Sequence, residues 1–135
     1  MWSSEHLREG DVYTRAELRA LFAITDATIN TGIFRPAGHD SIWLFITERK
    51  PVDRTPYADH LSGDVLAFDG QIAGRTDPLI IAHERRGLEL LLFHRQHRGE
   101  FPGAGFRYEG RFRYVSHSGG QPTRFVAERV KAAAG

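Results

Sequence analysis

The sequence of 135 residues lacks cysteine altogether and contains only two lysines, Lys50 and Lys131. Without cysteine, the chain has no disulfide framework, no thiolate zinc site and no thiol nucleophile. It has no apolar run long enough to cross a membrane, and its N-terminal residues lack the basic and apolar segments of a secretory signal. We therefore expect a cytoplasmic protein without a membrane partner.

The charges nearly cancel, with 18 Lys and Arg residues against 17 Asp and Glu residues and a formal net charge of +1. A domain that binds nucleic acid through its overall field usually carries a basic excess, so binding of that kind is not indicated. Nearly all of the cations are arginine, whose planar guanidinium pairs with phosphates and guanine edges through two hydrogen bonds. Any contact with nucleic acid is therefore expected from local clusters of arginine.

No motif of a common enzyme class is present: the sequence has no P-loop, no dinucleotide fingerprint, no Gly-x-Ser-x-Gly elbow and no His-Glu-x-x-His. The histidines match no standard metal-ligand spacing, even where His94, His97 and His117 come nearest to a cluster. Carboxylates such as Asp64 and Asp77 precede a predicted strand and a predicted helix, where Asp commonly caps backbone donors. The sequence therefore predicts a binding domain with no catalytic residue, no metal and no cofactor.

Two short helices are predicted from local signals. Thr14 and Glu17 have the spacing of a capping box, and the apolar residues that follow recur at helical spacing, which predicts a helix over 15–23. A second helix is predicted to begin after Asp77, which is a suitable N-cap and is followed by a proline at the first helical position. Gly87 is a suitable residue to end this helix.

At least five segments have strand patterns, at 41–47, 65–68, 88–93, 106–115 and 123–130. The clearest is 106–115 (FRYEGRFRYV), in which strict alternation predicts aromatic residues on one face and charged residues on the other. Gly110, on the aromatic face, is a candidate for a bend or bulge. We interpret the aromatic face as core and not as a base-stacking platform, because a chain of this length needs its large apolar side chains inside. That face holds Phe106, Tyr108, Phe112 and Tyr114.

The segments 48–62 and 95–105 are predicted as surface loops, because they hold prolines, glycines and charges without an apolar period. No linker or internal repeat divides the chain, so we expect one domain over residues 1–135 with a core of about 13–130. The order of elements predicts an α+β fold: a strongly bent β-sheet or β-barrel with short helices at its rim.

Four short motifs follow one another along the chain: SIWL at 41–44, YADHLSGD at 57–64, FDGQ at 68–71 and FRYEG at 106–110. Over about 32–130 their order resembles the SRA (SET- and RING-associated, or YDG) domain of the PUA-like superfamily. The counterparts there are a Ser-hydrophobic strand, a Tyr-Glu-Asp-Asp loop, a Tyr-Thr-Gly turn and an Arg-Tyr-Asp-Gly strand. The sequence is also similar to PUA-like modules beside bacterial HNH nucleases and helicases. Both resemblances imply a bent barrel and a role in restriction or genome defence.

The resemblance to SRA domains implies a partner, double-stranded DNA, from which a modified cytosine is flipped into an aromatic pocket. By motif position, Tyr57 and Phe68 would stack on the base, while Asp59 and Asp69 would accept hydrogen bonds from its amino group. Phe68 and Asp69 replace the usual Tyr and Thr of the family. The implied base is of the 5-methylcytosine or 5-hydroxymethylcytosine class, and the implied context is a restriction system with a fused or associated nuclease.

Basic residues in the predicted loops are the candidates for DNA contacts, because they can follow the phosphate backbones or enter the gap left by a flipped base. They are Arg35, His39, Arg49, Lys50, Arg54, Arg75, Arg95, His97 and Arg98. Two other functions stay open on the sequence alone. One is an RNA-binding module of the PUA or ASCH type, and the other is a non-catalytic interaction domain of a helicase or nuclease.

Overall fold

The computed structural model describes residues 3–26, 29, 31–48, 59–71 and 73–131, and every structural statement below refers to these residues. They form two α-helices, α1 (Arg15–Phe22) and α2 (Asp77–Ile81), and eight strands. The strands are β1 (Val12–Tyr13), β2 (Ile33–Phe34), β3 (Ser41–Thr47), β4 (His60–Ser62), β5 (Val65–Asp69), β6 (Glu89–Arg95), β7 (Phe106–Ser118) and β8 (Arg124–Arg129). Neither helix is long and apolar enough to cross a membrane.

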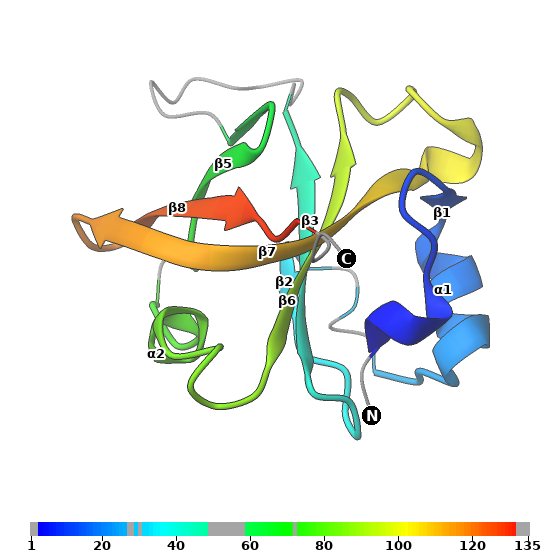
Figure 1. The fold of residues 1–135 in the computed structure, drawn as a ribbon. Coiled ribbons are helices and arrows are strands. Elements are labelled where there is room, and N and C mark those ends of the chain that lie inside the picture. Colours follow the sequence, from blue (N-terminus) through cyan, green and yellow to red (C-terminus); the bar gives the residue numbers. More distant parts are fainter. Residues whose placement is uncertain (1–2, 27–28, 30, 49–58, 72, 132–135) are drawn as a thin grey trace.

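All of the strands belong to one mixed sheet with the order β2-β3-β6-β7-β8-β5-β4, and β1 pairs with β7. The sheet is strongly bent and does not close, and the long strand β7 crosses the middle of the molecule (Figure 1). The predicted α+β fold with a bent sheet is confirmed.

The parallel strands β3 and β6 are neighbours in the sheet and are buried along almost their whole length. Neighbouring residues of a strand point to opposite faces, so these two strands contribute to two separate cores. Ile42 and Leu44 belong to one core and Trp43 to the other. The first core is packed with Ile80 of α2, the second with Leu18 of α1. Figure 1 accordingly has the two helices on opposite sides of the central strands.

A bulge interrupts the pairing of β7 with β6. Leu92 pairs with Gly110 and the next residue, Phe93, pairs with Tyr108, so Glu109 is an extra residue on β7. Gly110 has a φ of +94°, and a Cβ added to it would lie 2.8 Å from Cδ of Glu9. Only glycine fits such a position without strain. The predicted irregularity at Gly110 is therefore confirmed.

The bulge also changes the phase of alternation along β7. Phe106 and Tyr108, before the bulge, lie in the core under α1, whereas Phe112 and Tyr114, after it, pack in the core with α2. The expectation that all four aromatic residues share one face is therefore wrong, because a period of two does not account for an inserted residue. The interpretation as core is confirmed for Phe106, Tyr108 and Phe112, whereas Tyr114 is partly buried against the core.

The two helices were predicted with different success. At α1 the capping box is present: the Glu17 backbone N–H donates to Thr14 Oγ1, and the Thr14 N–H donates to Glu17 Oε1. Helix α2 ends earlier than expected, at Ile81, and its N-cap is Thr76 instead of Asp77. The Asp77 carboxylate accepts a hydrogen bond from Thr123 Oγ1, 46 residues away, which local sequence does not indicate.

Candidate nucleic-acid interface

The segment 49–58, which carries Tyr57 and three of the predicted DNA contacts, comes between β3 and β4 in the sequence. Four of the predicted binding residues, Tyr57, Arg49, Lys50 and Arg54, lie outside the described residues. The described chain stops at Glu48, directly after β3, and resumes at Asp59, directly before β4.

The structure brings together Asp59 and Asp69, two of the residues predicted to bind the base. The Asp69 backbone N–H donates to Asp59 Oδ1 at 3.0 Å. Arg124 Nη1 lies 3.1 Å from Asp69 Oδ1 and 3.6 Å from Asp59 Oδ1. Sequence reasoning missed Arg124, which is the cross-strand partner of Asp69 in the pairing of β5 with β8.

Phe68, predicted to stack on the base, is a core residue. Its side chain is 0% exposed, and its ring stacks on Phe125 with centroids 5.3 Å apart and planes 21° apart. Leu66 and Phe68 share the inward face of β5, which explains the burial. This placement disagrees with a stacking role for Phe68, because its apolar surface is already used in the core.

Arg95, predicted as a loop cation that contacts DNA, is instead the last residue of β6 and only 8% exposed. Its guanidinium lies 4.0 Å from the centroid of the Phe106 ring and donates to Thr47 Oγ1 and to the Ala104 carbonyl. Burial, and then the charge of Arg98 nearby, lower the pKa of Arg95. Arg95 therefore supports the fold and does not lie free on the surface.

The other described candidates for DNA contact are mostly accessible. Arg35, Arg75, His97 and Arg98 are exposed. His39 is half-buried, with its ring edge-on to Phe22 at a centroid distance of 5.3 Å. The exposed arginines come from three separate loops.

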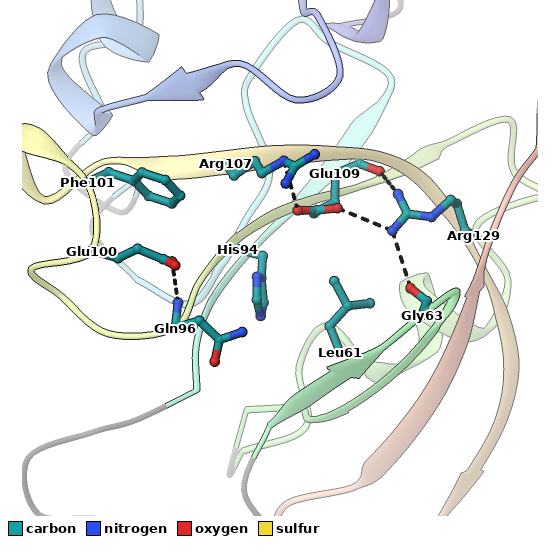
Figure 2. Close-up of a pocket in the computed structure, with 9 residues that line it drawn as sticks. All are labelled: Leu61, Gly63, His94, Gln96, Glu100, Phe101, Arg107, Glu109 and Arg129. Atoms are coloured by element: carbon teal, nitrogen blue, oxygen red, sulfur yellow. Dashed lines mark hydrogen bonds and ion pairs between the residues drawn. The ribbon is translucent and has the colours of Figure 1, made fainter.

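A polar cavity of about 270 Å³ opens between the β4–β5 turn, the loop after β6, and strands β7 and β8 (Figure 2). Carboxylate, guanidinium, imidazole and amide groups all reach it, beside one aromatic ring. Its lining residues are Leu61, Gly63, His94, Gln96, Glu100, Phe101, Arg107, Glu109 and Arg129. Sequence reasoning did not find this cavity, because its walls come from five elements far apart along the chain.

Glu48 joins the elements beside this cavity. Its carboxylate accepts hydrogen bonds from His94 Nε2 of β6, from His60 Nδ1 at 2.6 Å and from the Leu61 N–H at 3.4 Å. Glu48 and His60 flank the segment 49–58, so one carboxylate connects the two ends of that segment to β6. Burial raises the pKa of Glu48, but the hydrogen bonds from the two histidines lower it by more than burial raises it. The net pKa is therefore below the ordinary value.

We expect Glu48→Gln to lower the free energy of unfolding by about 1–3 kcal/mol at pH 7, because the buried His94 loses an ionised acceptor. A carboxylate whose pKa is lower in the folded state stabilises the fold above its ordinary pKa of about 4.3, and this contribution disappears as the pH falls through the folded-state pKa. The free energy of unfolding, measured with urea, should therefore fall more steeply below pH 5 for the wild type than for Glu48→Gln. The exposed Glu84, as Glu84→Gln, is the control; equal slopes for wild type and Glu48→Gln would contradict the assignment.

Comparison with known proteins gives matches in structure but not in sequence. The sequence matches no protein-family profile and no curated protein. A modification-dependent TagI restriction endonuclease matches 93% of this chain and 50% of its own, with a TM-score of 0.55 at 18% identity. The SUVH5 SRA domain in complex with hemimethylated CG DNA matches 95% of this chain and 92% of its own, with a TM-score of 0.56 at 16% identity.

A third match is SUVH6 of Arabidopsis thaliana, with a TM-score of 0.60 at 18% identity over 96% of this chain and 27% of that one. The chain thus spans about half the length of the TagI nuclease and about a quarter of SUVH6. At these identities the matches establish the fold. The chain has the fold of the SUVH5 SRA domain, which is the fold that the resemblance of its four sequence motifs to SRA domains implied.

Proposed function

We propose that this chain is a non-catalytic reader of a modified cytosine in double-stranded DNA, which it flips out of the duplex. The observation that carries the proposal is the fold shared with the SUVH5 SRA domain, whose structures contain hemimethylated CG and methylated CHH DNA. The same fold in a modification-dependent restriction endonuclease supports a role as the specificity module of such a system, fused to or associated with a nuclease.

Two features of the chain are compatible with this function. Exposed arginines in separate loops, such as Arg35, Arg75 and Arg98, can contact phosphates on both strands although the net charge is only +1. The Asp59 and Asp69 carboxylates lie next to the segment that carries Tyr57. That these residues bind the base remains a prediction from the resemblance, and with Phe68 in the core, Tyr57 is the remaining predicted stacking ring.

The direct test measures binding to three duplexes that differ at one cytosine, which is plain, 5-methylated or 5-hydroxymethylated. We expect tighter binding to at least one modified duplex, and Tyr57→Ala to remove the difference, because stacking on an aromatic ring contributes about 1–3 kcal/mol per base. Arg54→Ala should weaken all three duplexes equally and lower the salt slope by about 1, as loss of a phosphate contact does. Fluorescence anisotropy at several salt concentrations gives both quantities.

Equal affinity of the wild-type protein for the three duplexes would refute the reader proposal. A structured RNA hairpin of the same length belongs in the same assay as a competitor. If it displaces the modified duplex at lower concentration than plain DNA does, the RNA-binding function would be favoured instead. Competition that is insensitive to salt would also count against both nucleic-acid functions.

A further inference from the structure

We propose that the cavity in Figure 2 is the pocket that receives the flipped base, and that Glu109, His94 and Arg107 recognise its polar edge. This inference rests on the proposed function and names the residues that determine which base is accepted. It replaces the predicted position between Tyr57 and Phe68, because Phe68 is buried in the core.

The described residues that flank the segment 49–58, which carries Tyr57, lie at the cavity. Leu61 lines the cavity, and its backbone N–H donates to Glu48 Oε2 at 3.4 Å. His94 lines it too and donates to the same carboxylate. Because Glu48 precedes the segment and Leu61 follows it closely, both ends of the segment adjoin the cavity wall. A base taken out of a duplex bound along this segment therefore has a pocket within reach.

His94 has a polar atom available for a ligand. Its side chain is only 8% exposed, and the bond from Nε2 to Glu48 fixes the orientation of the ring. Among the residues that the structure describes, its second nitrogen, Nδ1, has no hydrogen-bond partner. Figure 2 shows the ring at the centre of the cavity. Because His94 lines the cavity and its Nδ1 makes no bond to the described protein, this nitrogen can form a hydrogen bond to a ligand there.

The charges around the cavity favour an uncharged polar ligand over a phosphate. Glu109 lies between two arginines, 3.5 Å from Arg107 Nε and 3.2 Å from Arg129 Nη2, and Glu100 adds a second carboxylate. The two lining arginines are thus balanced by two glutamates, which would repel a phosphate. An amino-bearing nucleobase suits these groups, since its amino group donates to a carboxylate and its carbonyl accepts from a guanidinium or imidazole.

The remaining walls and the size of the cavity agree with a single base. Phe101 and Leu61 supply apolar surface for the faces of a planar ring. The volume of about 270 Å³ is just below the usual range of small-molecule sites, about 300–1,000 Å³. The Asp59–Asp69 pair is the alternative position for the base, and its carboxylates, like that of Glu109, contact an arginine.

The test compares base discrimination and base flipping in Glu109→Gln and Phe101→Ala with the wild type. Discrimination is the affinity ratio between the 5-methylcytosine and plain duplexes, measured in parallel with 5-hydroxymethylcytosine. Flipping is followed by the fluorescence of 2-aminopurine placed opposite the modified cytosine. We expect either substitution to lower discrimination by about 5- to 100-fold and to reduce the fluorescence increase. Phe101 lies on the cavity rim in a loop, so Phe101→Ala tests the pocket even if Glu109→Gln affects folding.

Glu84→Gln is the matched control for Glu109→Gln, because Glu84 is an exposed glutamate paired with an arginine and lies outside this cavity. If the wild type does not discriminate between the duplexes, the proposed function fails and this inference fails with it. If the wild type discriminates and both pocket variants keep the full ratio, only the assignment of the pocket is overturned. A greater loss of discrimination in Asp69→Asn than in either pocket variant would also overturn the assignment, and would indicate that the base binds at the Asp59–Asp69 pair.

Discussion

Replacing Phe68 with alanine is expected to lower the free energy of unfolding by about 3–5 kcal/mol, the usual result of truncating a fully buried phenylalanine. The ring is fully buried in the core that also contains Leu66 and Ile80 of α2, and it stacks on Phe125. A domain of this size has a total stability of about 5–15 kcal/mol, so the variant would be near the limit of folding. Urea unfolding followed by far-UV circular dichroism measures the loss.

Phe68→Leu separates the structural role from a role in base binding. Leucine keeps most of the apolar volume, so this variant should remain folded, and we expect it to distinguish modified from plain DNA as the wild type does. Val65→Ala, on the same strand but on its exposed side, should change stability by no more than about 0.5 kcal/mol. A folded Phe68→Leu protein that binds both duplexes equally would restore Phe68 as a base-stacking residue.

The elements predicted well are those whose determinants lie within a few residues of one another. The capping box at Thr14 and Glu17 is complete within four positions, and α1 begins where it predicts. The strand at 41–47 is apolar nearly throughout, and β3 has these same bounds. In both cases the sequence pattern and the local hydrogen bonding depend on the same short segment.

The features that were missed depend on pairing between distant residues. The phase change in β7 arises from its register with β6, which alternation within 106–115 does not contain. Glu48 and His94 are 46 residues apart and meet beside the cavity only because β3 and β6 are parallel neighbours. Arg95 looked like a loop cation because its aromatic partner, Phe106, lies on the next strand.

The candidate site was predicted in part for the same reason. The motif positions predicted that Asp59 and Asp69 lie together, and Asp59 does meet Asp69. Motif position cannot, however, tell which face of β5 carries Phe68, because that depends on which side of the sheet is enclosed. The cavity in Figure 2 has walls from five elements, so no single motif contains it.

Arg129→Ala is expected to destabilise the protein by about 2–3 kcal/mol, because one guanidinium joins three parts of the sheet. Its Nη1 donates to the Glu109 carbonyl at the bulge, Nη2 lies 3.2 Å from Glu109 Oε1, and Nε donates to Asp64 Oδ1 at 3.0 Å. The guanidinium also lies 5.1 Å from the centroid of the Phe112 ring. It is 23% exposed, so the loss should be smaller than for a fully buried ion pair.

Lys131 is the matched control, since it also pairs with Asp64, at 3.3 Å, but is 77% exposed. Lys131→Ala should change stability by less than about 1 kcal/mol. Arg129→Lys should recover little of the loss, because an ammonium lacks the planar fork that reaches Glu109 and Asp64 together. Equal losses in Arg129→Ala and Lys131→Ala would mean that the network contributes only surface charge. A larger loss in Arg129→Ala would mean that this residue holds the β4–β5 turn against the bulge of β7, the two elements that face each other across the cavity.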